Sequence, residues 1–313
     1  MKVSVVIRTY NEARYLDELL QAISAQSLGR ELVEIVLVDS GSQDETLSIA
    51  KRYGCRVVHI DKADFTFGRS LNMGCEAASG DYLAFISGHC VPKQLDWLEQ
   101  LVAPLKEGLA SYSYGRQVGR DTTKFSESQV FRKYFPAVSR VPQEGFFCNN
   151  ANAAITREAW QAVRFDEQLT GLEDLCLSKQ LVAAGHKVAY VAEAGVYHIH
   201  DENWRQVRIR YEREALALRE IMPEVHVSFW DFLRYFLTGV INDWRYALLE
   251  RKFFVCCAEI VAFRLMQFWG TYQGNLEHRQ ISARRREEYF YPMEPRRDAS
   301  AKKLSGPSAH ESP

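Results

Sequence analysis

The stretch MKVSVVIRTYNE, residues 1–12, opens the chain with a short β-branched run that ends in polar residues. Similar runs follow at residues 35–39, 56–60 and 82–86, and helical patterns separate the first three of them. This alternation is typical of repeated βα units on a parallel sheet. The sequence therefore predicts an α/β fold whose first strand covers residues 3–7.

Polar loops follow three of these predicted strands, at residues 9–12, 39–44 and 87–89. Open α/β sheets bind ligands in the crevice at the carboxyl ends of their strands. We therefore expect these loops to converge on one edge of the sheet and to carry a binding site.

Composition excludes several classes of protein. The chain has 313 residues, of which 47% are hydrophobic and 25% charged, as in ordinary globular proteins. Its net charge of −1 argues against nucleic-acid binding. Its seven cysteines form no C-x-x-C pair, which disfavours a disulfide framework or a zinc knuckle and favours a reducing compartment. Neither G-x-G-x-x-G nor a P-loop pattern is present, so dehydrogenase and P-loop functions lose support.

The later sequence predicts a change of architecture. A helix at residues 173–184 and a strand at 187–192 complete one domain over residues 1–200. Helices dense in aromatic and arginine residues follow, and they predict a helical C-terminal extension over 201–278. The basic segment 279–313 is predicted to be a largely disordered tail, because its last twenty residues contain almost no apolar side chains.

The predicted aromatic helices at 229–241 and 253–269 leave two alternatives open. Charged and amide residues of the second helix fall within an arc of roughly 140°, so a wide apolar face must be covered. That face packs on the catalytic domain or a second copy of the chain, or it lies in a membrane interface beside Trp230, Trp244, Trp269 and the basic run 284–286. We expect no transmembrane span, since Glu259, Arg264 and Gln267 interrupt the longest apolar region.

Four motifs carry a resemblance to a known family. They are V-V-I-R-T-Y-N-E at 5–12, V-D-S-G-S-Q-D-E-T at 38–46, G-D-Y-L-A-F-I-S-G-H-C-V-P at 80–92 and G-L-E-D at 171–174. Over residues 2–200 the chain resembles family 2 glycosyltransferases, which implies the GT-A fold, a single Rossmann-like domain for nucleotide-diphospho-sugars. The Y-H-x-H pattern at 197–200, followed by an arginine-rich helix, is similar to bacterial rhamnosyltransferase-like members that build surface polysaccharides.

The resemblance implies a nucleotide site at the strand ends. It places the nucleobase and ribose against the first two loops, a basic residue near the sugar-nucleotide, and a serine at the fourth strand: Thr9, Tyr10, Glu12, Asp39, Asp44, Arg69 and Ser87. Helix capping is the alternative role for Asp44, a structural cap at the strand end is the alternative for Asp39, and an exposed helical position is the alternative for Arg69.

The metal motif of the family is D-x-D, and Ser87-Gly88-His89 stands in its place. The resemblance implies a divalent cation, Mn²⁺ or Mg²⁺, held here by His89 and His198. Imidazole suits manganese better than magnesium, which prefers oxygen ligands. The alternative needs no ion: Arg69, with arginines from the segment 205–213, neutralises the leaving diphosphate.

Glu173-Asp174 opens a predicted helix, where acidic residues also complement the helix dipole. The resemblance assigns Asp174 as the general base of an inverting transfer, and it places Glu173 and Asn150 beside the donor and acceptor sugars. A buried turn is the alternative role for Asn150.

The implied partners are a nucleotide-diphospho-sugar donor and a glycan or lipid-linked acceptor. We expect a cytoplasmic enzyme, and association with the inner membrane surface or as a homodimer stays open. Two other functions compete: an inactive nucleotide- or glycan-binding relic, and a sugar nucleotidyltransferase, which should carry a glycine-rich N-terminal loop in place of T-Y-N-E.

Overall fold

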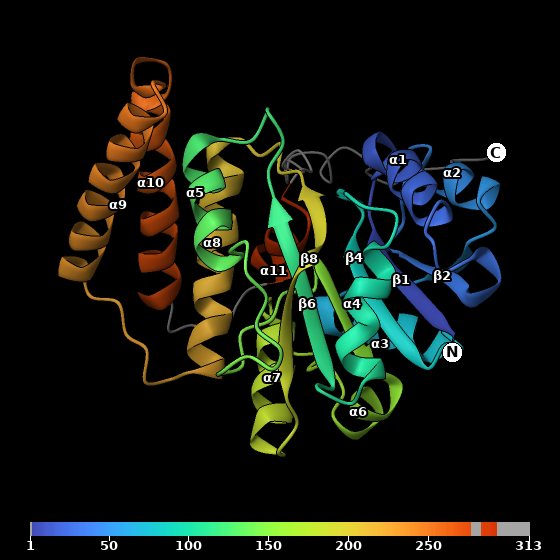
Figure 1. Cartoon of the computed structure of the whole chain (residues 1–313). Coiled ribbons are helices and arrows are strands. Elements are labelled where there is room, and N and C mark those ends of the chain that lie inside the picture. The colour runs from blue at the N-terminus through green and yellow to red at the C-terminus, as the bar shows by residue number, and fades with distance from the viewer. Residues whose placement is uncertain (1, 277–282, 293–313) are drawn as a thin grey trace, which may run out of the picture.

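The computed structural model describes residues 2–276 and 283–292. Its centre is an eight-stranded mixed sheet with the strand order β3-β2-β1-β4-β7-β6-β8-β5, flanked by helices on both faces (Figure 1). The predicted α/β architecture is confirmed. A three-residue 3₁₀ helix, Arg30–Leu32, leads into β2.

The first half of the sheet is parallel and contains the four predicted strands. These are β1 (Val3–Thr9), β2 (Val33–Asp39), β3 (Arg56–His59) and β4 (Tyr82–Ser87). Parallel strands joined by crossover helices bring their carboxyl ends to one edge. The loops after β1, β2 and β4 therefore meet there, as the sequence predicts.

The second half of the sheet is mixed. Strand β7 (Asn152–Thr156) runs antiparallel between β4 and β6 (Tyr112–Val118), and β8 (Val188–His198) lies parallel to β6. Strand β8 extends beyond the predicted end at residue 192, because its last residues pair with the short strand β5 (Cys90–Pro92). That register sets Cys90 opposite His198 and so brings the fourth strand's loop to the end of β8.

Alternating strand residues divide the core between the two faces of the sheet. On one face Val3, Val5 and Ile7 pack against α1 (Ala13–Ser24), α2 (Thr46–Arg52) and α4 (Trp97–Lys106). On the other face, residues such as Val6 and Phe85 pack against four helices. These are α3 (Phe67–Ala77), α5 (Phe125–Tyr134), α6 (Arg157–Ala162) and α7 (Glu173–Ala183).

Three long helices follow the sheet: α8 (Trp204–Ile221), α9 (Phe229–Leu249) and α10 (Phe253–Leu276). Helix α10 lies against α8, where a Cβ on Gly270 would come within 2.3 Å of the Arg208 carbonyl oxygen. Only glycine permits so close a backbone approach. Helices α9 and α10 form an antiparallel hairpin at the side of the molecule (Figure 1).

The polar arc of α10 faces inward. The Arg264 guanidinium pairs with the Asp243 carboxylate of α9 at 2.7 Å, and Ser126 of α5 donates to the same carboxylate. Glu259 accepts the backbone N–H of Phe125 at 2.8 Å. The hairpin therefore packs on the rest of the protein through these polar groups and through apolar residues such as Phe125 and Ile260, and several of its apolar side chains stay exposed.

By length and mean hydropathy, α10 is one helix that could cross a membrane, with 33% of its apolar window buried inside the protein. The expectation that the chain has no transmembrane span stays a prediction.

The predicted tail is wrong in part. Residues 283–290 form helix α11 (Ala283–Phe290), and Tyr289 is fully buried. Phe290 packs edge-on against Phe65 and Phe67, so aromatic burial holds a segment that we expected to be disordered. The expectation of disorder from Glu294 onward lies outside the described residues.

Candidate active site

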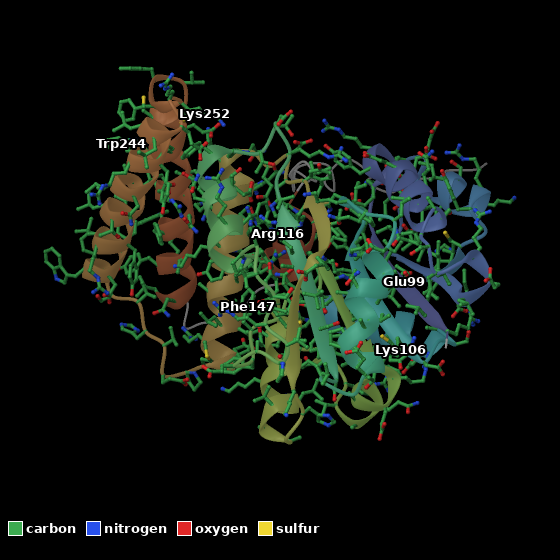
Figure 2. All side chains as sticks on the ribbon, in the orientation of Figure 1. Glu99, Lys106, Arg116, Phe147, Trp244 and Lys252 are labelled. Atoms are coloured by element: carbon green, nitrogen blue, oxygen red, sulfur yellow. The ribbon has the colours of Figure 1, made fainter. Side chains whose placement is uncertain are left out.

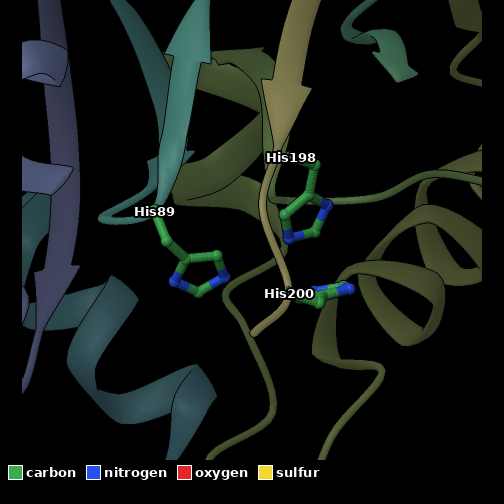
Figure 3. A group of neighbouring side chains, drawn as sticks. All are labelled: His89, His198 and His200. Atoms are coloured by element: carbon green, nitrogen blue, oxygen red, sulfur yellow. The ribbon is translucent and has the colours of Figure 1, made fainter. Parts of the chain in front are cut away.

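Three histidines gather at the end of β8 (Figure 3). His89 follows β4. Its carbonyl oxygen accepts a hydrogen bond at 3.2 Å from the backbone N–H of Ile199, the residue between His198 and His200. One ring nitrogen of each histidine lies within 4.8 Å of the others. The rings of His198 and His200 are 4.1 Å apart, and those of His89 and His198 are 5.2 Å apart. The structure therefore brings together both histidines predicted to hold a metal and adds a third.

The Nδ1 atom of each histidine faces an oxygen of another side chain. The partners are Glu12 at 3.1 Å from His89, Gln117 at 2.7 Å from His198, and Glu127 at 2.7 Å from His200. When Nδ1 donates to such an oxygen, Nε2 carries the lone pair and the ring orientation is fixed. This arrangement is common around histidines that bind metal ions.

Electrostatics differ between the histidines. Burial, together with the charges of His200 and His89, lowers the pKa of His198 well below its ordinary value, so its ring is neutral at neutral pH. Burial also lowers the pKa of His89, but the Glu12 carboxylate outweighs it and leaves that pKa raised. A neutral His198 with a free Nε2 lone pair is in the protonation state that metal ligation requires.

Asp174 lies buried at the start of α7. Burial and the neighbouring charge of Glu173 raise the pKa of Asp174 to about 7. Its two oxygens accept the backbone N–H groups of Asn150 at 2.8 Å and Leu175 at 2.7 Å, which fixes the carboxylate but leaves one further lone pair on each oxygen. A buried carboxylate with a pKa near neutrality can take a proton from a substrate hydroxyl.

Glu173 and Asn150 border the same carboxylate. Glu173 forms an ion pair with Arg8 of β1 at 2.9 Å. Asn150 accepts a hydrogen bond from the Tyr112 hydroxyl, while its buried Nδ2 has no hydrogen-bond partner among the described residues. Since an unmade buried hydrogen bond is costly, this amide is free to donate to a ligand hydroxyl.

Two arginines border the site: Arg8, which was not expected from the sequence, and Arg213, which was expected only as one of the arginines of the segment 205–213. Arg8 pairs with Glu173, and Arg213 of α8 lies near Gly171 of the G-L-E-D motif. Both guanidiniums stack on the Phe67 ring, at 4.8 and 4.7 Å from its centroid. Burial lowers the pKa of Arg213, and its Nε has no hydrogen-bond partner among the described residues. A charge inside an otherwise apolar strand was the available sequence signal for Arg8.

Glu127 was not expected from the sequence, and Arg210 was named only within the segment 205–213. Glu127 of α5 accepts from His200 and from Arg210 of α8, each at 2.7 Å. Burial raises the pKa of Glu127, but the charges of His200 and Arg210 outweigh it and hold that pKa at about 2. The Glu127–Arg210 ion pair therefore connects α8, the arginine-rich helix, to the histidine cluster. Of the arginines in the segment 205–213 that the metal-free alternative invokes, Arg210 and Arg213 lie at the site, whereas Arg205 pairs with Glu288.

The predicted nucleotide loops are polar, but their groups bind one another. Asp39 is fully buried and accepts four hydrogen bonds, from the hydroxyls of Thr9 and Ser42 and the backbone N–H groups of Gly41 and Ser42. These contacts favour the structural alternative for Asp39, a cap at the strand end. A direct hydrogen bond from a nucleobase requires one of them to open.

Asp44 and Glu12 connect the first two loops. Asp44 is exposed and accepts the backbone N–H of Thr46 at 3.0 Å and that of Ala13 at 3.0 Å, so it stabilises the starts of α2 and α1. These bonds lower its pKa, although partial burial acts in the opposite direction. Glu12 reaches the His89 ring instead of open solvent, and Gly88 leaves room for it, since a Cβ there would lie 2.9 Å from Glu12 Cγ.

Tyr10 and Ser87 lie at the strand ends, and Arg69 lies apart from the groups that surround Asp174. The Tyr10 ring packs at 4.7 Å on Tyr291, the residue after α11, and Lys62 contacts both rings. Ser87 ends β4. Arg69 is half-exposed and pairs with Asp64 at 3.3 Å, in a cavity of about 160 Å³ that Glu167 also lines. Arg69 and Arg286 are balanced there by Asp64 and Glu167, so the lining has no excess positive charge to favour a diphosphate, and the exposed-helix alternative fits Arg69 better.

A second cavity of about 240 Å³ opens beside the histidines, between the end of β6 and α5. It is lined by Arg116, Gln117, Phe131 and Arg132, and Figure 2 shows Arg116 between these two elements. Gln117 holds the His198 ring, and Phe131 stacks on it at 5.7 Å. The buried Nε of Arg116 has no hydrogen-bond partner among the described residues. The cavity therefore offers an unpaired cationic donor next to the cluster.

A parallel half-sheet with loops at its carboxyl edge, a buried acidic pair and a histidine cluster define the GT-A class of nucleotide-diphospho-sugar transferases. The model of the family "Glycosyl transferase family 2" matches residues 4–164, about half of the chain. The chain belongs to this family. It is a glycosyltransferase that moves a sugar from a nucleotide-diphosphate donor to an acceptor hydroxyl with inversion.

Two relatives illustrate how similar the sequence is to known glycosyltransferases. The chain is 28% identical over 225 residues to the O-antigen chain rhamnosyltransferase RfbN of Salmonella typhimurium, covering 67% of this chain and 70% of the relative. It is 31% identical over 251 residues to the poly(ribitol-phosphate) β-N-acetylglucosaminyltransferase TarS of Staphylococcus aureus, covering 77% of this chain and 41% of that protein.

Solved structures show the same fold. The mannosyltransferase PcManGT of Pyrobaculum calidifontis, in complex with GDP-Man and Mn²⁺, superposes with a TM-score of 0.59 at 17% identity, over 94% of this chain and 88% of that one. In this chain the donor set fits a divalent cation, because three imidazoles with hydrogen-bonded Nδ1 atoms each place a ring nitrogen within 4.8 Å of the other two.

Proposed function

We propose that the chain transfers rhamnose from a nucleotide-diphosphate donor to a lipid-linked glycan, in the synthesis of a bacterial surface polysaccharide. The observation that carries the site assignment is Asp174, a buried carboxyl group whose pKa is raised to about 7 by burial and by Glu173, beside the histidine and arginine groups. The sugar assignment is supported by the rhamnosyltransferase relatives. We extend the proposal to the cytoplasmic face of the inner membrane, where a lipid-linked acceptor is reached.

Asp174 is the general base of this proposal. The acceptor hydroxyl attacks the anomeric carbon from the face opposite the diphosphate, the bond from that carbon to the diphosphate oxygen breaks, and the hydroxyl proton passes to Asp174. The backbone donors of Asn150 and Leu175 keep the carboxylate in place. The free Nδ2 of Asn150 binds a hydroxyl of the reacting sugars.

The leaving diphosphate is neutralised by Arg8 and Arg213, and a bound divalent cation would add to their positive charge. The residues that would hold the cation are His89, His198 and His200, and a bound cation supplies positive charge for the diphosphate oxygens. Neutral imidazoles favour Mn²⁺ over Mg²⁺. Arg213 adds a fixed donor, because burial on the Phe67 ring leaves its Nε without a partner among the described residues.

The nucleotide lies over the loops after β1 and β2. Thr9, Asp39 and Asp44 fix the backbone of these loops, and Tyr10 and Glu12 border the nucleotide site. Ser87 offers a hydroxyl to the ribose. The acceptor reaches Asp174 through the cavity at Arg116, whose guanidinium binds an acidic group of that acceptor.

A panel of nucleotide sugars tests the proposal. The wild-type chain is incubated with each donor, Mn²⁺ and a lipid-linked acceptor, and both transfer and donor hydrolysis are followed. The proposal expects turnover of a nucleotide-activated rhamnose in preference to activated glucose, mannose or N-acetylglucosamine. Turnover of another donor alone contradicts the sugar assignment, and no turnover of any donor supports the inactive relic. Asp174→Asn is the matched control for contaminating activity.

A further inference from the structure

The α9–α10 hairpin exposes four large apolar side chains at its turn. Phe254 and Val255 in the first turn of α10 are 93% and 90% exposed, and Leu249 at the end of α9 is 79% exposed. Leu248 beside it is 58% exposed. We call these four residues the hairpin tip. Soluble proteins rarely leave four large apolar side chains together in water, so we expect another surface to bury the tip.

The hairpin buries a polar group beside an apolar cluster that includes Val240, Ala247 and Ile260. Arg264, Asp243 and Gln267 form a buried hydrogen-bonded group, and Glu259 caps the start of α5. A helix of a soluble protein normally turns its charges to water and its apolar side chains to the core. Here charged groups are buried within the hairpin while four large apolar side chains at the tip stay exposed, which suits a surface that meets an apolar surrounding.

Basic residues surround the tip. Arg245, Arg251 and Lys252 are exposed, and the nearest acid, Glu250, is already paired with Arg132 at 2.6 Å and Lys252 at 3.4 Å. The local charge is therefore positive although the whole chain carries −1. Apolar side chains bordered by lysine and arginine match the boundary between acyl chains and anionic headgroups, whereas a second copy of the same tip would bring like charges together.

The hairpin tip lies at the same end of the molecule as the catalytic edge of the sheet. Figure 1 shows the turn between α9 and α10 at the same end of the molecule as the arrowheads of β6 and β8, and Figure 2 places Trp244 and Lys252 at that end. The histidine cluster lies at the end of β8, and α5 lies between the hairpin and the Arg116 cavity. A bilayer that holds the tip therefore faces the catalytic edge of the sheet.

We infer that the hairpin tip, Leu248, Leu249, Phe254 and Val255, inserts into the interface of an anionic lipid bilayer and so presents the catalytic edge to a lipid-linked acceptor. The second half of this inference rests on the proposed function, while the first half, bilayer binding, does not. The occupant is the bilayer itself, with its apolar boundary taking the four side chains and its headgroups taking the basic ones.

Vesicle flotation of the full chain tests the inference without donor or acceptor. The wild type should float with vesicles of phosphatidylethanolamine and phosphatidylglycerol, and the double variant Phe254→Ser/Val255→Ser should bind about tenfold or more weakly, because its apolar contacts are lost. The matched control is Leu237→Ser/Ile241→Ser, which removes two exposed apolar residues from the middle of α9 and should bind like the wild type.

Charge is tested separately with Arg251→Glu/Lys252→Glu, which should weaken binding to anionic vesicles and leave the weaker binding to phosphatidylcholine vesicles unchanged. All these side chains are exposed, so unfolding is not expected, and a circular-dichroism melt checks it. Three results overturn the inference: a wild type that stays unbound, tip variants that float normally, or tip variants that lose a dimer in light scattering instead of vesicle binding. Failure here leaves the donor panel, and with it the proposed function, unaffected.

Discussion

The two halves of the catalytic edge use polar residues differently. In the loops after β1 and β2, the carboxylates of Asp39 and Asp44 accept hydrogen bonds from neighbouring backbone and hydroxyl groups. Around β8, α7 and α8, by contrast, the buried groups keep free atoms, such as Asn150 Nδ2 and Arg213 Nε. In the proposed function the first region therefore forms the floor on which the nucleotide lies, and the second supplies the groups that do the chemistry.

The largest expected effect comes from the second region. Asp174→Asn should lower the transfer rate by about 10²–10⁴-fold, the usual range for one acid–base group, while donor binding changes little. The amide still accepts one of the two backbone N–H groups that hold Asp174 in place. Single-turnover rates and calorimetry with the free nucleotide measure the two quantities. Full activity would remove Asp174 from the mechanism.

Arg213→Gln should come next, with a loss of about 10²–10³-fold in rate, because a fixed charge facing the diphosphate is lost. Arg205→Gln is the matched control on the same helix, since Arg205 pairs with Glu288 away from Gly171. Equal losses in both variants would indicate a defect of α8 and not of the diphosphate site.

The pH profile should show a smaller effect with a definite sign. Burial and Glu173 raise the pKa of Asp174 to about 7, and the base acts only when ionised. The rate should therefore fall about tenfold per pH unit below that pKa and level off above it. In Asp174→Asn the residual rate should lose this acid limb. An unchanged limb in the variant would assign the titration to another group.

The smallest expected effect on activity belongs to the first region. Asp39→Ala should cost about 1–3 kcal/mol of folding stability, since four hydrogen-bond donors lose their buried acceptor. Nucleotide affinity should change only as far as the loop loosens. Thermal melts and calorimetry with the free nucleotide decide this, and a large loss of affinity in a stable variant would restore Asp39 as a direct nucleobase contact.

The sequence was informative where a pattern is local. Strand periodicity predicts β1 to β4, and Gly185 marks the end of α7 at a residue with φ of +90°. The family resemblance implies that Asp174, Asn150 and the two histidines belong to one site, and this stays a prediction. The structure adds His200 to this group. Its Nδ1 forms a hydrogen bond with Glu127 of α5, a residue far from it in the sequence.

Long-range packing explains what the sequence could not predict. Arg8 and Arg213 meet on the Phe67 ring from β1 and α8, which are far apart in the chain. Helix α11 returns to the sheet because Phe290 finds an aromatic surface on Phe65 and Phe67. The inward polar arc of α10 depends on Asp243 of α9. A helical period shows that two faces differ but not which one is covered.

Metal dependence tests the central claim, that the histidine region carries the chemistry, most directly. The transfer rate is measured for the chain as purified, after removal of metals with EDTA, and after return of Mn²⁺ or Mg²⁺. We predict that the rate falls to near background in EDTA and recovers more fully with Mn²⁺ than with Mg²⁺, and that His198→Ala needs far more Mn²⁺ for recovery. A rate that is unchanged in EDTA would contradict the account and leave Arg8 and Arg213 alone to neutralise the diphosphate.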